Sequence, residues 1–197
     1  IHVSTDEVYG ENLGKHYSEK QILNPTNPYS ASKAAADMIV NSYNHSYKLN
    51  VTTVRANNIF GIRQFPEKLI SKSIYNFLKK KKMTIHGNGS SNRYYLSVED
   101  FCEGLIKIIK KGKTGEIYNI SSEKYYNILK IVKLISIYLK IDFKKNIIFI
   151  KDRPFNDKIY RINSNKIRKL GWKPLKNLND ELPKLCEWYK KNLNLFK

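Results

Sequence analysis

The first residues that could do chemistry form the run Ser4-Thr5-Asp6-Glu7 near the start of the sequence. The run begins at Ser4, the last of residues 1–4, which we expect to be the end of a buried strand. In open α/β sheets, ligands bind at the carboxyl ends of the strands. A hydroxyl and two adjacent carboxylates are therefore predicted to lie where a substrate would bind. Taken alone, the same residues fit a solvated polar loop equally well.

A second candidate pair is Tyr29 and Lys33, on a helix that we expect to begin near Pro28. Side chains four residues apart on a helix lie about 40° apart around its axis and point the same way. A free tyrosine has a pKa near 10, and a neighbouring ammonium would lower it. The pair is therefore a candidate general base for a hydroxyl group. Alone it is weak, since many surface helices carry such pairs, but Thr5 would complete a Ser/Thr, Tyr, Lys set.

The elements that must position these residues alternate between strand and helix, which predicts an α/β fold with a parallel sheet. Besides the first strand, we expect strands or extended segments at residues 51–54, 84–86, 94–98, 116–120 and 146–150. Helices are expected from Pro28 onward and at residues 66–82, 99–111, 127–140, 164–170 and 180–192. The first helix is predicted to pack through an apolar face of Ala31, Ala34, Ala35, Met38, Ile39 and Tyr43.

Composition narrows the possible classes of protein. The 197 residues are 41% hydrophobic, enough for a folded core, and the formal net charge is +19. This charge is spread along the chain without a nucleic-acid-binding motif, so nucleic-acid binding is not favoured. No apolar run approaches the ~20 residues of a membrane span. Cys102 and Cys186 lie in apolar-periodic stretches without zinc-type spacing, so we predict buried free thiols, no metal, and a reducing, cytoplasmic location.

The two candidate clusters belong to a longer series of matching blocks. These include Ser-Thr-Asp-Glu-Val-Tyr-Gly at 4–10, Asn-Pro-Tyr-Ser-Ala-Ser-Lys at 27–33, residues 55–61, residues 64–70 and Leu-Gly-Trp-Lys-Pro at 170–174. Over nearly its whole length the chain resembles the dTDP-glucose or UDP-glucose 4,6-dehydratases. They are extended short-chain dehydrogenase/reductases of the nucleotide-sugar epimerase/dehydratase superfamily. The adjacent Asp6-Glu7 pair distinguishes them from the epimerases and decarboxylases.

The resemblance implies the C-terminal part of a Rossmann-type doubly wound parallel sheet, interleaved with a smaller α/β substrate-binding domain. Residues 1–62 and about 99–120 would form the second half of the NAD-binding domain. Residues about 63–98 and 121–197 would form the nucleotide-sugar-binding domain. The family opens with a Gly-rich turn on which the pyrophosphate of NAD rests. No such turn is found here, so we expect the sequence to be truncated at its N-terminus.

The resemblance also implies catalytic roles for Thr5, Asp6, Glu7, Tyr29 and Lys33. Tyr29 would take the proton of the sugar 4-hydroxyl while hydride moves to NAD, and Lys33 would lower the Tyr29 pKa and hold the nicotinamide ribose. Thr5 would hydrogen-bond the 4-oxygen. Glu7 would remove the C5 proton, and Asp6 would protonate the departing C6 hydroxyl. Two carboxyls in different environments can divide these tasks.

The remaining implied contacts are with cofactor and substrate. Ile59 would contact NAD through its backbone. The sugar nucleotide would contact Asn58, Lys68, Leu69, Arg93, Asn127, Asp152, Arg153 and Asn156. Lys68 also fits a plain surface lysine. Two departures from bacterial members, His86-Gly87 and Phe155-Asn156, leave the choice between thymine and uracil open.

A homodimer is implied as well, through a bundle that includes the helix of Tyr29 and Lys33. Two alternatives to the dehydratase stay open. One is a related nucleotide-sugar epimerase or decarboxylase, which Asp6 disfavours. The other is a non-catalytic remnant or binding protein that kept the fold without the NAD site.

Overall fold

The computed structural model describes residues 1–12, 14–152 and 157–196. Its first sheet consists of three parallel strands, in the order β1 (His2–Thr5), β2 (Thr53–Ala56) and β6 (Ile117–Ile120). Thr5 pairs with Ala56, and Ala56 pairs with Ile120, so the three carboxyl ends meet at one edge. The predicted α/β fold with a parallel sheet is confirmed.

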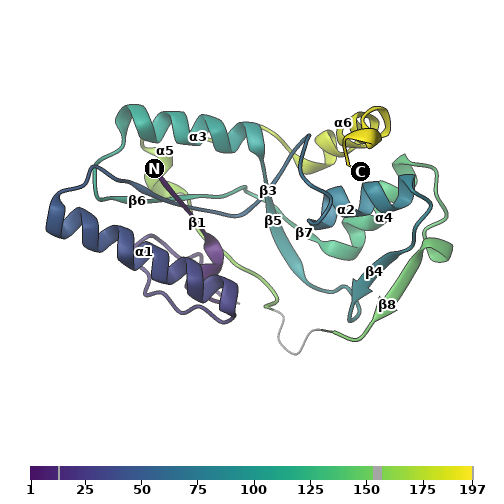
Figure 1. The fold of residues 1–197 in the computed structure, drawn as a ribbon, viewed down its shortest axis with the longest axis horizontal. Helices are drawn as coiled ribbons and strands as arrows, with labels where there is room; N and C mark the ends of the chain where they lie inside the picture. The colour runs from purple at the N-terminus through teal and green to yellow at the C-terminus, as the bar shows by residue number, and fades with distance from the viewer. Residues whose placement is uncertain (13, 153–156, 197) are drawn as a thin grey trace.

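Helices cover the two faces of this sheet. In Figure 1, α1 (Pro28–Tyr47) lies below the strands and α3 (Val98–Lys111) above them. Asn27 caps α1 in a capping box with Ser30, and Pro28 occupies the first turn, where its missing N–H has no partner to lose. The helix therefore begins where the sequence predicted.

The apolar face predicted for α1 is buried only at Ala34, and its other members are exposed. Met38, Ile39 and Tyr43 are 68%, 57% and 51% exposed. The buried residues of α1 are Ser30, Ala34 and Asp37, at spacings of four and three. Small and polar side chains let the helix approach the sheet closely, and this leaves its larger apolar side chains outside.

The second half of the molecule contains a mixed sheet and a separate strand pair. β3 (Asn58–Phe60), β5 (Asn92–Ser97) and β7 (Tyr125–Asn127) form the sheet, and β4 (Met83–His86) pairs in parallel with β8 (Ile147–Ile150). β3 and β7 were not predicted, because three residues are too few to show strand alternation. Figure 1 shows β3 and β5 in the middle of the molecule, and β4 and β8 at the end that lies away from β1.

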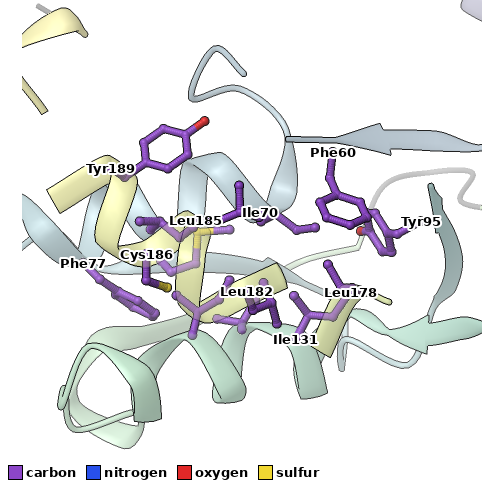
Figure 2. Close-up of a cluster of buried hydrophobic side chains, with 14 of the residues drawn as sticks. Phe60, Ile70, Phe77, Tyr95, Ile131, Leu178, Leu182, Leu185, Cys186 and Tyr189 are labelled. Carbon is purple, nitrogen blue, oxygen red and sulfur yellow. The ribbon is translucent and has the colours of Figure 1, made fainter. Parts of the chain in front are cut away.

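Three helices supply the core of the second half: α2 (Leu69–Leu78), α4 (Ile128–Tyr138) and α6 (Leu178–Lys191). In Figure 2 the side chains of Phe77, Ile131, Leu182 and Cys186 converge between these helices. Shorter elements complete the chain: α5 (Asn165–Arg168) and 3-10 turns at Asp6–Tyr9, Lys144–Asn146 and Leu193–Leu195. No helix in the described residues has the length and hydropathy needed to cross a membrane.

The two cysteines differ. Cys186 is buried as predicted, but Cys102 is exposed, so that part of the prediction is wrong. The buried face of α3 consists of Asp100, Phe101, Gly104 and Ile108. Cys102 follows Phe101 by one residue, and a rotation of about 100° per residue turns it away from that face.

Residues from the end of the chain return to the first sheet. Ile167 of α5 and Trp172 join the cluster that contains Val54 and Ile120. Trp172 Nε1 also donates to the Asp100 carbonyl at 2.9 Å. The segment of Ile167 and Trp172 therefore packs and hydrogen-bonds against α3 beside the sheet that ends at the candidate site.

Candidate active site

The run Thr5-Asp6-Glu7 lies where β1 leaves the sheet and turns into the 3-10 segment Asp6–Tyr9. Thr5 caps this turn by accepting the Glu7 backbone N–H at 3.3 Å. The turn closes at Gly10, whose φ is +75° and where a Cβ would lie 2.3 Å from the Asn24 carbonyl oxygen. Only glycine fits there, so the two carboxyls are fixed just beyond the strand.

Asp6 is a buried carboxyl, 3% exposed. Its Oδ1 accepts from the Thr5 hydroxyl at 3.1 Å, and its Oδ2 accepts from Asn57 Nδ2 at 2.6 Å. Burial raises the pKa of Asp6 to about 7; the charge of Glu7 adds to this, while the hydrogen bonds and the charge of Arg93 oppose it. Asp6 therefore keeps its proton at a much higher pH than an ordinary aspartate and can donate it near neutral pH.

Glu7 has a different environment from Asp6. It is half-buried, and its Oε2 accepts from Asn27 Nδ2 at 3.3 Å. The Asn27 side chain also accepts from the Ser30 N–H at 2.9 Å as the cap of α1. This amide therefore ties Glu7 to the first turn of α1, the turn that carries Tyr29. Two adjacent carboxyls in unequal environments can act as acid and base in the same reaction.

Tyr29 and Lys33 face the end of β1 from α1. Burial and the charges of Glu7 and Asp6 raise the pKa of Tyr29, and a hydrogen bond between Tyr29 and Thr5 lowers it. Lys33 Nζ donates to the Val3 carbonyl at 2.7 Å. The expected lowering of the Tyr29 pKa by Lys33 is not seen, because burial and the two carboxyls act in the opposite direction.

A buried ion pair holds α1 against the sheet. Arg55 Nε donates to Asp37 Oδ2 at 2.8 Å, and both side chains are 4% exposed. Arg55 Nη1 also donates to the Tyr9 hydroxyl at 2.9 Å, and His2 Nε2 lies 2.8 Å from Asp37 Oδ1. This network joins α1, β2 and the turn after β1, the three elements that carry the candidate site.

Of the predicted cofactor residues, Lys33 and Tyr29 have polar groups open to a ligand, whereas the Ile59 backbone does not. An ammonium has three donors, of which Lys33 gives one to Val3 among the described residues. Tyr29 is 56% exposed, so its phenol is accessible to a ligand. Ile59 is already engaged through its backbone: it pairs with Leu96, and its carbonyl accepts from Gln64 Nε2 at 2.7 Å.

Two predicted substrate residues lie next to this centre. Arg93 is close enough to lower the pKa of Asp6. Its guanidinium carbon lies 5.3 Å from the centroid of the Tyr160 ring, and its Nη1 donates to the Lys158 carbonyl at 3.1 Å. Asn58 begins β3, and its Nδ2 donates to the Tyr94 carbonyl at 3.5 Å. Both lie on strands of the second sheet, which the chain enters at Asn58, two residues after β2 ends.

Other predicted substrate residues lie in the second half of the molecule. Lys68 has a 67% exposed side chain 3.6 Å from Glu67, and Leu69 is the first residue of α2. Asn127 caps α4 through Lys130 N at 3.1 Å, which gives it a structural role in addition to the predicted substrate contact.

One more of the predicted substrate-binding residues lies within the described part of the chain. Asp152 packs against Gly87, where a Cβ would lie 2.6 Å from Asp152 Oδ2. Gly87 has a φ of +57°, so both the space and the backbone favour glycine there. Arg153 and Asn156 lie outside the described residues.

Sequence reasoning missed several residues that support the site. Asn27 could have been found, because asparagine before a helix-starting proline is an N-cap signal. Asn57 follows β2 as Asp6 follows β1, which was also a usable signal. Asp157 and Tyr160 carry no local signal. The Asp157 carboxylate accepts from the Thr26 hydroxyl at 3.0 and 3.1 Å and from the Tyr160 hydroxyl.

The chain is similar to known proteins in sequence and in structure. The family model for GDP-mannose 4,6 dehydratase matches residues 1–184. An Arabidopsis thaliana protein named trifunctional UDP-glucose 4,6-dehydratase/UDP-4-keto-6-deoxy-D-glucose 3,5-epimerase/UDP-4-keto-L-rhamnose-reductase is 43% identical over 98% of this chain. The human dTDP-D-glucose 4,6-dehydratase is 39% identical over 100% of the chain.

A solved structure agrees with these relatives. The dTDP-glucose 4,6-dehydratase of Streptomyces venezuelae, crystallised with NAD bound, superposes with a TM-score of 0.95 and 32% identity over 100% of this chain. The chain spans 29% of the plant protein, 58% of the human protein and 61% of the Streptomyces chain.

Proposed function

The chain belongs to the GDP-mannose 4,6 dehydratase family, and from this premise we propose that its protein is an NAD-dependent lyase that dehydrates dTDP-glucose or UDP-glucose to the 4-keto-6-deoxy sugar. One observation carries the proposal. Asp6 is buried, hydrogen-bonded and has a pKa of about 7, while the adjacent Glu7 is half-buried and held by a different amide. An elimination of water needs such an acid and such a base side by side.

In this mechanism each residue handles a proton at a defined atom. Tyr29 takes the proton of the sugar 4-hydroxyl, and Thr5 hydrogen-bonds the same oxygen. Once C4 is a ketone, its neighbouring C5 proton is acidic, and Glu7 removes it. Asp6 gives its proton to the C6 hydroxyl, which leaves as water. The raised pKa of Asp6 suits this donor role near neutral pH.

NAD, when bound, would accept a hydride from the sugar and return it, so that no net oxidation occurs. Lys33 and Tyr29 would hold the nicotinamide ribose, with Ile59 nearby on β3. A cationic nicotinamide close to Tyr29 would favour the phenolate and oppose the two carboxyls that raise the Tyr29 pKa.

We propose that residues about 63–98 and 121–197 form the nucleotide-sugar-binding domain, as predicted from the sequence. Arg93 lies beside Asp6 and suits a bidentate contact with two oxygens of a phosphate. The net charge of +19 would attract an anionic nucleotide sugar. Asn58, Lys68, Leu69, Asn127 and Asp152 are proposed to line the rest of the path.

We further propose that two copies pair through α1 and that the protein works in the reducing cytoplasm. Ile39, Tyr43 and Tyr47 lie along one exposed stripe of α1, and the rings of Tyr43 and Tyr47 stand 5.5 Å apart. An Ile39→Lys variant would place a charge in this stripe. Sedimentation should show a dimer for the unchanged protein and a monomer for the variant, and a monomer for both would reject the pairing.

The function is tested with the protein as its gene encodes it, supplied with NAD and each of the two sugars. Mass spectrometry should show a product lighter than the substrate by one water. A product of unchanged mass would instead indicate an epimerase. A parallel reaction with UDP-glucuronic acid tests the decarboxylase, which would release carbon dioxide from that sugar. Failure of both glucose nucleotides with cofactor bound would refute the dehydratase.

A further inference from the structure

Asn57 lies at the point where the chain crosses from the first sheet into the second. It follows β2, which ends at Ala56, and precedes β3, which begins at Asn58. Because Thr5 pairs with Ala56 in the parallel ladder, Asn57 and Asp6 leave their strands side by side. The Asn57 N–H donates to the Ile120 carbonyl at 3.3 Å, which fixes its backbone to the third strand.

The two ends of the Asn57 amide have different surroundings. Nδ2 donates to Asp6 Oδ2 at 2.6 Å. Oδ1 is buried and has no hydrogen-bond partner within the described residues, and the whole residue is 3% exposed. The carboxylate fixes which end faces it, since only the NH₂ can donate to an anion. The amide oxygen is therefore held as a buried acceptor next to the proposed acid.

We propose that Asn57 is a further residue of the sugar site, whose Nδ2 positions the Asp6 carboxyl while its Oδ1 accepts a hydrogen bond from the C6 hydroxyl that Asp6 protonates. This rests on the proposed dehydration. As the C6–O bond breaks, the proton of Asp6 passes to the leaving oxygen, which departs as water. Asp6 becomes a carboxylate, and the short hydrogen bond from Nδ2 stabilises the negative charge that develops on it.

The charged groups around Asp6 are consistent with this role. Glu7 adjoins it in the same turn, Arg93 lies close by on β5, and Tyr29 faces it from α1. Of the groups that favour the ionised Asp6, Asn57 has the largest effect, followed by Thr5 and Arg93. Removal of the amide should therefore make Asp6 a weaker acid without changing its burial.

The test uses the full protein with Asn57→Leu, which keeps the branched shape but removes both polar ends, and Asn57→Ala as a smaller second variant. Asn76→Leu is the matched control, because Asn76 is half-buried on α2, and its amide faces Met83 Sδ at 3.8 Å, away from the site. Thermal melting verifies that each variant is folded. We expect kcat to fall about tenfold to a hundredfold in the Asn57 variants and to stay unchanged in the control.

Two readouts separate positioning from a structural effect. The basic limb of the kcat–pH profile should move to higher pH in Asn57→Leu, since Asp6 must be protonated to act. The infrared carboxyl band of Asp6, assigned by its loss in Asp6→Asn, should titrate at the same higher pH. The infrared measurement needs no turnover, so it decides the Asn57–Asp6 contact even where neither sugar is dehydrated. An unchanged titration midpoint would overturn the proposal.

The contact of Oδ1 with the sugar is tested by binding in a Tyr29→Phe background, which blocks turnover. With Asn57 present, UDP-glucose or dTDP-glucose should bind about fivefold tighter than its 6-deoxy analogue, as expected for one hydrogen bond. Asn57→Leu should reduce that preference, because only the contact of the C6 hydroxyl with Asp6 would remain. Equal preference with and without Asn57 would overturn the contact.

Discussion

Replacement of Asp6 by Asn is expected to stabilise the protein at neutral and alkaline pH while it abolishes the dehydration. Asparagine has nearly the same shape and keeps the surrounding hydrogen bonds. Its Oδ1 can accept from Asn57 Nδ2, and its Nδ2 can donate to the Thr5 hydroxyl oxygen, the two partners of the present carboxyl. The only large change is the loss of a charge that the buried site holds at a cost.

The magnitude follows from the pKa. The pKa of Asp6 rises from 3.8 to about 7 on folding, mainly through burial. A difference of about three at 1.36 kcal/mol each corresponds to ~4 kcal/mol of unfolding free energy. Because the folded-state pKa is raised, the unfolded chain releases the proton first. The contribution of Asp6 to the unfolding free energy is therefore full below about pH 4, declines as the pH rises towards 7, and stays low above it.

Urea unfolding of the protein and of Asp6→Asn across this pH range measures the effect. Near pH 4 the two unfolding free energies should nearly agree, and by about pH 8 the variant should be more stable by up to ~4 kcal/mol. Since Asn cannot donate a carboxylic proton, product formation should be lost in the same variant. A constant difference between the two proteins at every pH would refute the buried-acid reasoning.

Two further substitutions and one labelling experiment test the site and the packing around it. Tyr29→Phe should lower kcat about 10²- to 10⁴-fold with little change in sugar affinity, and an unchanged kcat would remove Tyr29 as the base. Asp37→Ala, which leaves Arg55 buried without its carboxylate, should cost about 3 to 5 kcal/mol in urea unfolding; a loss below about 1 kcal/mol would contradict the pairing. A maleimide should label Cys102 at once and Cys186 only in denaturant, because burial raises the pKa of Cys186 to about 12; equal labelling would contradict this.

The positions of the candidate residues in the fold were easier to predict than the packing. Thr5, Asp6 and Glu7 could be placed because they follow a strand, and Tyr29 could be placed because Pro28 marks the start of its helix. Both signals are local, and both hold in the structure. Asn57 was missed although it follows β2, because an amide attracts notice as a site residue only once a carboxyl is known to lie beside it.

Failures of prediction came from long-range packing. The side of α1 that faces the sheet is decided by Arg55 on β2, which pairs with Asp37, and no periodicity within α1 can reveal that partner. The direction of the Tyr29 pKa likewise depends on Glu7 and Asp6, which reach it through the fold. The short strands β3 and β7 are stabilised by their backbone hydrogen bonds to β5, which lies between them, and their own sequences do not show this pairing.

The proposed reaction eliminates water through C4, C5 and C6 of a glucose nucleotide. It can be followed by supplying the intact protein and NAD with a glucose nucleotide that carries deuterium at C4. Dehydration should give a 4-keto-6-deoxy product, lighter by one water, with that deuterium recovered in the C6 methyl group. Deuterium retained at C4 in a product that still has its C6 hydroxyl would show epimerisation instead and would refute the dehydratase.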